Sequence, residues 1–275
     1  MRIYVSADME GITGLVDADD VQPGGRDYEQ GRRMMAEDVN AAARGAVSAG
    51  ATRITVNDAH GPMRNLLPET LHPAVRLIRG RPKIMGMLDG LTADYDAVVC
   101  VGYHSRAGTL GVLSHSFMGH EIEDMWLDGR PVGEIGLAHA TAAAIGVPVA
   151  LLTGDNRACE EMADWDPSVA TVAVKYAHDR FAAELRPAEE ARAAVEKAVA
   201  ESLVVRRTTP KAPESAALTV RWQSASVASV LQGIPGVTVE DHRTVQARGT
   251  LPGLYRQFGV WMRVAASLTD QPPYC

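Results

Sequence analysis

Acidic and histidine side chains recur directly after short apolar runs in the first half of the chain. Asp8 and Glu10 follow the first run and are two residues apart, so an extended backbone points both carboxylates the same way. His60 and His104 follow two later runs. A cation relieves the repulsion between paired carboxylates, and imidazole is a common zinc ligand. These four residues therefore indicate a metal site.

Glu134 is a fifth candidate ligand. It begins a predicted helix that runs to about Ile145, after a hairpin whose two-residue turn is Asp128-Gly129. A structural zinc takes four ligands and a catalytic zinc usually takes three plus water, so five ligands with one bridging carboxylate suit two ions. Asp8 is the natural bridge. Singly, each residue could instead cap a turn, complement a helix dipole or be a buried histidine, so the prediction depends on their repeated placement after strands.

The apolar runs alternate with segments of helical spacing, the longest of which covers residues 27–48. This alternation predicts an α/β fold with a mostly parallel sheet that is flanked by helices on both faces. Ligands of such sheets gather outside the carboxyl ends of the strands, where the candidate residues lie. The runs that predict strands are Arg2–Ala7, Arg53–Val56, Ala97–Val101 and Pro148–Thr153.

The pattern of the chain changes near residue 186. An Ala/Glu-rich helix begins at Pro187, and residues 206–215 are polar with two prolines. The predicted strands and helices that follow suit a small α+β layer. We therefore predict a metal-binding α/β catalytic domain over residues 1–185 and a smaller C-terminal α+β domain over residues 186–275.

Composition limits the classes of partner. Hydrophobic residues make up 46% and charged residues 22% of the 275 residues, which is typical of a globular protein. The net charge of -7, without a basic stripe, argues against nucleic acid. No run approaches the roughly 18 apolar residues of a membrane helix, so no membrane partner is expected. Cys100, Cys159 and Cys275 are odd in number and far apart, which favours a reducing cytoplasm over a disulfide framework.

Several segments, in order, resemble the zinc D-aminopeptidase family, peptidase family M55. The resemblance implies that Asp8, Glu10, His60, His104 and Glu134 bind two zinc ions per subunit and that His115 is the catalytic residue. It also implies removal of the N-terminal residue from short peptides, including D-amino-acid peptides, by a homodecamer of two stacked pentameric rings. The matching segments are residues 6–12 (Ser-Ala-Asp-Met-Glu-Gly-Ile), 56–60, 102–106, 114–116 (Ser-His-Ser), 130–134 and 154–155.

Several alternatives stay open at this point. A metal-dependent phosphatase or amidohydrolase uses the same ligand types on a similar scaffold. The handedness of the substrate depends on pocket side chains, and these ligands also accept manganese or cobalt. His115 could bind the oxyanion, transfer a proton or attack the substrate directly. Asp58 and Asp155 could either orient the ligating histidines or cap loops.

Overall fold

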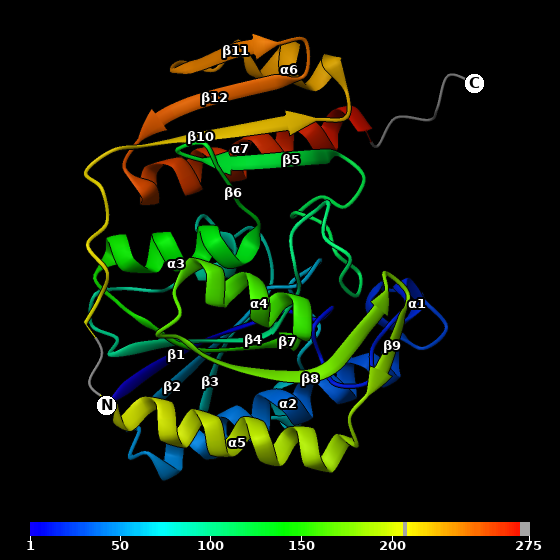
Figure 1. Cartoon of the computed structure of the whole chain (residues 1–275), viewed down its shortest axis with the longest axis vertical. Coiled ribbons are helices and arrows are strands. Elements are labelled where there is room, and N and C mark those ends of the chain that lie inside the picture. The colour runs from blue at the N-terminus through cyan, green and yellow to red at the C-terminus, as the bar shows by residue number, and fades with distance from the viewer. Residues whose placement is uncertain (206–207, 270–275) are drawn as a thin grey trace.

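This computed structural model describes residues 1–205 and 208–269. A seven-stranded sheet runs through the lower part of the molecule as drawn in Figure 1, with helices above and below it. The strand order is β3-β2-β1-β4-β7-β8-β9, and every neighbouring pair is parallel except β8 and β9. The strands are β1 (Arg2–Ala7), β2 (Arg53–Asp58), β3 (Val75–Ile78), β4 (Ala97–Tyr103), β7 (Val149–Asp155), β8 (Ala170–Asp179) and β9 (Ala182–Leu185).

Helices cover both faces of this sheet. On one face α2 (Tyr28–Ser48) and α5 (Ala188–Val204) lie side by side, and on the other lie α3 (Glu134–Ile145) and α4 (Asn156–Trp165) (Figure 1). Because successive strand residues point to opposite faces, Ile3 and Val5 join the core around α2, whereas Tyr4 joins the core around α3. Two cores therefore hold the sheet rigid. The short helices are α1 (Ala18–Val21), η1 (Pro68–Thr70) and η2 (Gly86–Leu88).

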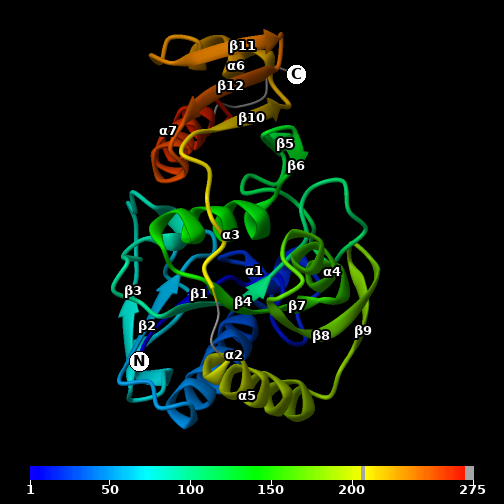
Figure 2. The same ribbon diagram turned by 60° about the vertical axis from the view of Figure 1, so that its left-hand side comes forward.

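A second, antiparallel sheet lies above α3, and residues 208–215, which lead into β10, pass beside that helix (Figure 2). Its strand order is β11-β12-β10-β5-β6, so the central hairpin of the chain joins strands from the C-terminal part. Helix α7 packs against α3 and α6. The elements are β5 (Ile122–Leu127), β6 (Arg130–Pro131), β10 (Ala216–Trp222), α6 (Ala225–Leu231), β11 (Val237–Asp241), β12 (Thr244–Gly249) and α7 (Leu251–Thr269).

The predicted fold class is confirmed: a mostly parallel sheet flanked by helices, with a smaller antiparallel layer. The helix at Glu134–Ile145 and the turn at Asp128-Gly129 lie where the sequence predicts them. Helix α5 packs with the larger sheet, and the hairpin β5–β6 belongs to the smaller one. The division into residues 1–185 and 186–275 concerns which parts fold independently, and it stays a prediction.

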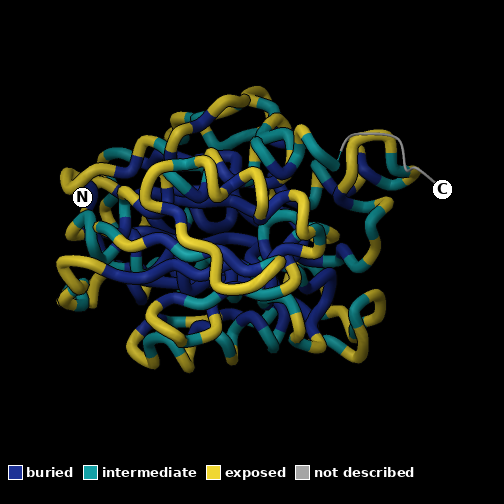
Figure 3. Tube along the Cα trace, turned by 90° about the horizontal axis from the view of Figure 1, so that it is seen from above, coloured by how far each residue is buried: buried dark blue, intermediate teal, exposed yellow. Residues whose placement is uncertain are grey.

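Buried residues fill the centre of the molecule and exposed residues form its rim (Figure 3). Cys100 is buried in β4, Cys159 is partly buried, and Cys275 lies outside the described residues. None of the helices that the structure describes is long and apolar enough to cross a membrane.

Candidate active site

The predicted site lies where the strand order of the large sheet reverses. From β1 the sheet continues through β2 and β3 on one side and through β4, β7 and β8 on the other. At such a point the loops after neighbouring strands diverge and leave a crevice for ligands. The structure brings all six predicted residues to one cavity of about 350 Å³ at this position. They are Asp8 and Glu10 after β1, His60 after β2, His104 after β4, His115 on the loop from β4 to β5, and Glu134 at the start of α3.

A glycine allows the Asp8–Glu10 turn to lie directly against the end of β4. The Gly11 N–H donates to the carbonyl oxygen of Gly102 at 2.8 Å. A Cβ atom at Gly11 would lie 2.0 Å from the carbonyl oxygen of Tyr103, which is too close for any side chain. Because residue 11 has no side chain, Asp8 and Glu10 can lie next to the loop that carries His104.

A buried lysine that the sequence prediction missed fixes the same turn. Lys175 is fully buried, and its ammonium donates to the carbonyl oxygens of Glu10 at 2.6 Å, Ile12 at 2.9 Å and Leu15. Burial lowers the pKa of Lys175 to about 8. The available signal was a single cation in the apolar run Val-Ala-Val-Lys-Tyr of β8, because a buried lysine needs several acceptors.

Each of the three site histidines donates one ring N–H to a backbone carbonyl oxygen. Since a carbonyl oxygen only accepts, the proton of each neutral ring lies on that nitrogen and the other nitrogen carries a lone pair. Metal-binding histidines are commonly oriented in this way. The pairs are His60 Nε2 with Val21 (2.9 Å), His104 Nδ1 with Ser105 (3.0 Å) and His115 Nδ1 with Leu113 (2.8 Å).

The remaining nitrogen of His60 faces two carboxylates. His60 Nδ1 lies 2.9 Å from Glu10 Oε2 and 3.3 Å from Asp8 Oδ1. A lone pair that faces carboxylate oxygens is unfavourable unless a proton or a metal ion lies between them. Asp8, Glu10 and His60 therefore form one potential metal site, with ligand atoms within 4.8 Å of one another.

His104 faces the other side of Asp8. Its Nε2 lies 3.3 Å from Glu134 Oε1 and 3.6 Å from Asp8 Oδ2. Among the residues that the structure describes, neither His104 Nε2 nor Asp8 Oδ2 has a hydrogen-bond partner, although both atoms are buried. Such unsatisfied acceptors fit a metal ion better than they fit a metal-free core. Of the three groups of possible ligands among the described residues, the third being Glu10, His104 and His115, Asp8 belongs to two. It turns Oδ1 toward His60 and Oδ2 toward His104, as a bridging carboxylate would.

Burial and mutual charge shift the ionisation of this cluster. Burial, reinforced by the charge of Glu10, raises the pKa of Asp8 to about 7. Burial opposes the charged form of His60, but the Glu10 carboxylate raises the pKa of that histidine well above its ordinary value. Glu134 acts on His104 in the same way. The cluster therefore holds protons in the positions from which a metal ion would displace them.

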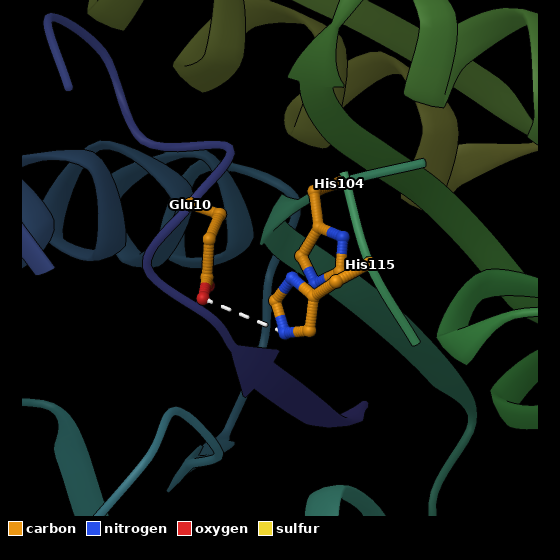
Figure 4. Close-up of side chains that lie close together, drawn as sticks. All are labelled: Glu10, His104 and His115. Atoms are coloured by element: carbon orange, nitrogen blue, oxygen red, sulfur yellow. Dashed lines mark ion pairs between the residues drawn. The ribbon is translucent and has the colours of Figure 1, made fainter. Parts of the chain in front are cut away.

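His115 differs from the other two histidines in its position. Its Nε2 lies 3.9 Å from both Glu10 Oε1 and Glu134 Oε1, and its ring stacks on His104 with centroids 4.2 Å apart (Figure 4). The His115 side chain is 17% exposed, whereas that of His104 is 1% exposed. Burial and the neighbouring charge of His104 lower the pKa of His115. A neutral His115 with a free Nε2 at the cavity can accept a proton.

The loop that carries His115 is strained on both sides of it. Leu113 and Phe117 have positive φ values of 51° and 56°, which are unfavourable for side chains with a Cβ atom. Backbone strain of this kind persists where other contacts enforce it, and it concentrates at functional sites. One such contact is visible: the Phe117 N–H donates to Glu134 Oε1 at 2.6 Å. The loop is thereby tied to a candidate ligand.

Asp58 and Asp155 do not orient the histidines. Asp58 accepts from the side chain of Asn65 and from the N–H of Leu66, both at 2.8 Å. Asp155 accepts from the backbone of the His115 loop and caps α4. The loop-capping interpretation is therefore correct for both, because the ring N–H groups of the histidines already bind backbone carbonyls.

Comparison with known proteins adds an independent result. A family model described as D-aminopeptidase, Peptidase M55, matches residues 1–256. A D-aminopeptidase of Bacillus subtilis (strain 168) is 38% identical over 248 residues, which cover 89% of each chain. A solved structure, the Zn-dependent D-aminopeptidase DppA from Bacillus subtilis, described as a self-compartmentalizing protease, matches with a TM-score of 0.94, 33% identity and full coverage of both chains. The chain therefore belongs to the D-aminopeptidase family, peptidase family M55.

Proposed function

We propose that this chain is a zinc-dependent aminopeptidase that removes the N-terminal residue from short peptides, in particular those that begin with a D-amino acid. In this proposal, Asp8, Glu10 and His60 hold one zinc ion, and Asp8, His104 and Glu134 hold a second. One observation carries it: two histidines, each with its N–H on a backbone carbonyl, turn their lone pairs toward buried carboxylates at 2.9–3.6 Å.

Two zinc ions held there would supply Lewis acidity at the scissile carbonyl and an activated water. The residues of the chain supply the rest. His115 accepts at Nε2 the proton that the attacking water loses and passes it to the leaving amine, a role that its lowered pKa and its position at the cavity favour. The hydrogen bond from its Nδ1–H to the carbonyl oxygen of Leu113 holds the neutral ring in the tautomer whose Nε2 can accept that proton.

The substrate class follows from the relatives and from the cavity. Related chains of known activity are D-aminopeptidases, and a cavity of about 350 Å³ has the size of a small-molecule site. Family membership does not favour the alternative of a metal-dependent phosphatase or amidohydrolase.

We also propose that the chain works as a homo-oligomer in the cytoplasm. The resemblance to the family implies ten subunits in two stacked pentameric rings, and the related DppA is described as self-compartmentalizing. Enclosure of the active sites would restrict access to short peptides. Light scattering should give a mass ten times that of the chain, and a monomer would contradict this assembly.

The activity is tested with matched dipeptides on zinc-loaded protein. We expect release of the N-terminal residue from D-alanyl dipeptides, slower release from L-alanyl dipeptides, and none from the N-acetylated forms. His115→Ala should lower kcat by about 100-fold or more while the zinc content stays unchanged. If neither dipeptide is cleaved, the peptidase proposal is wrong. If His115→Ala works at the wild-type rate, the assigned role of His115 is wrong.

A further inference from the structure

The cavity that contains the predicted metal ligands has cationic residues at another part of its wall. Arg81, between β3 and η2, and Arg263, on α7, both line it. These residues are far apart in the sequence. Arg81 belongs to the layer of the larger sheet and Arg263 to the layer of the smaller one. Their side chains are exposed, so they stand at the entrance, whereas Asp8 and Glu10 lie buried inside. The cavity therefore has an acidic interior and a basic entrance.

The two arginines line one cavity and, among the described residues, lack an acidic partner. Partial removal of the Arg81 guanidinium from water at the cavity wall, together with the like charge of Arg263, lowers the pKa of Arg81, so the two charges repel each other. Within residues 1–205 and 208–269, the structure shows no carboxylate in ion-pair contact with either group. Arg263 Nη2 makes only a long contact, 3.4 Å, with the carbonyl oxygen of Lys83. Two guanidinium groups without a neutralising carboxylate on one cavity wall are suited to bind a carboxylate.

Part of the cavity wall is apolar. Met87, Phe117 and Met262 line it, and Phe117 is held by edge-to-face contacts with two aromatic rings at 6.4 and 4.9 Å. The cavity thus offers the candidate metal ligands for the N-terminal end of a peptide, apolar surface for the peptide's side chains and cations for a negatively charged group. A dipeptide presents its amine, side chains and terminal carboxylate in that order.

We infer that Arg81 and Arg263 bind the C-terminal carboxylate of a short peptide substrate and thereby select peptides with a free C-terminus. This inference rests on the proposed function, because it places the scissile bond at the acidic end of the cavity. The two arginines are specificity-determining residues and take no part in the chemical step. Their loss should therefore raise KM more than it lowers kcat.

The experiment compares one D-alanyl dipeptide with its C-terminal amide. In the zinc-loaded wild type, amidation should lower kcat/KM by about tenfold or more, mainly through KM, because a charge-assisted contact is lost. In Arg81→Ala and in Arg263→Ala, the ratio between the free acid and the amide should fall toward one. Arg256→Ala is the matched control, because Arg256 is an exposed arginine of α7 that does not line the cavity. It should keep the wild-type ratio.

Each result has one meaning. Equal kcat/KM for the free acid and the amide in the wild type would overturn this inference alone, since the peptidase activity would still be present. A wild-type ratio in both arginine variants would also overturn it. Absence of cleavage of both peptides would instead contradict the proposed function on which the inference rests. Circular dichroism and zinc content, measured for every variant, identify a loss of activity that comes from misfolding.

Discussion

Replacement of Lys175 by Met tests whether the turn that carries Asp8 and Glu10 is held in place by a buried ammonium. Lys175 donates three hydrogen bonds, to the carbonyl oxygens of Glu10, Ile12 and Leu15. Hydrogen bonds from a charged donor are worth roughly 1.5–3 kcal/mol each. The burial cost of the charge, which also lowers the pKa of Lys175, offsets part of this gain. We expect Lys175→Met to lower the free energy of unfolding by about 3 kcal/mol.

The assay is urea denaturation of the metal-free protein, followed by circular dichroism. Zinc affinity, measured by competition with a chromophoric chelator, should fall by about tenfold or more, because the displaced turn misplaces two ligands. Lys197→Met is the matched control: Lys197 lies on α5 with 75% of its side chain exposed, so its replacement should change neither quantity. If Lys175→Met unfolds at the wild-type urea concentration and binds zinc with the wild-type affinity, the assigned role of Lys175 is refuted.

Three further changes test other parts of the site. Glu134→Gln should reduce bound zinc from two ions to one, because Glu134 is a ligand of only one of the two proposed ions. Elemental analysis that still finds two ions would contradict this assignment. Gly11→Ala should lower Tm by about 5 °C or more in calorimetry, since its Cβ would lie 2.0 Å from the Tyr103 oxygen. Gly259→Ala is the control and should leave Tm unchanged, because a Cβ atom at residue 259 would have no neighbour closer than 3.8 Å. Glu161 lies on α4, and burial raises the pKa of its carboxyl group to about 7, above its value in the unfolded chain. Ionisation of Glu161 therefore destabilises the folded state as the pH rises toward 7. We therefore compare the free energies of unfolding of metal-free Glu161→Gln and metal-free wild type. The variant should gain about 2 kcal/mol on the wild type between about pH 5 and pH 8, and a difference that does not change with pH would contradict this.

The larger sheet could be predicted because its central strands are buried on both faces. β1, β4 and β7 are therefore continuous apolar runs that stand out in the sequence. β3 and β8 were missed. β3 has no fully buried residue, and in β8 a lysine interrupts the short apolar run, which exposed and partly exposed residues flank on both sides. The hairpin β5–β6 was predicted from its turn, but its pairing with β10 depends on tertiary contacts that no local pattern encodes.

The candidate ligands could be predicted because they follow strand ends and match the motifs of a known family. The groups that orient them could not. His60 is oriented by the carbonyl oxygen of Val21, and a backbone carbonyl leaves no trace in the sequence. Similarly, Arg81 and Arg263 line one cavity because residues of α7, in the smaller layer, form part of its wall. Their joint role depends on the packing of the two layers.

The zinc content of the purified protein tests the central claim most directly. The metal-free chain is titrated with zinc, and bound metal and D-alanyl dipeptide hydrolysis are followed together. We predict that binding saturates at two ions per chain and that hydrolysis reaches its maximum at the same point, because Asp8 joins two groups of ligands. Saturation at one ion, or full hydrolysis by the metal-free chain, would contradict the two-metal site.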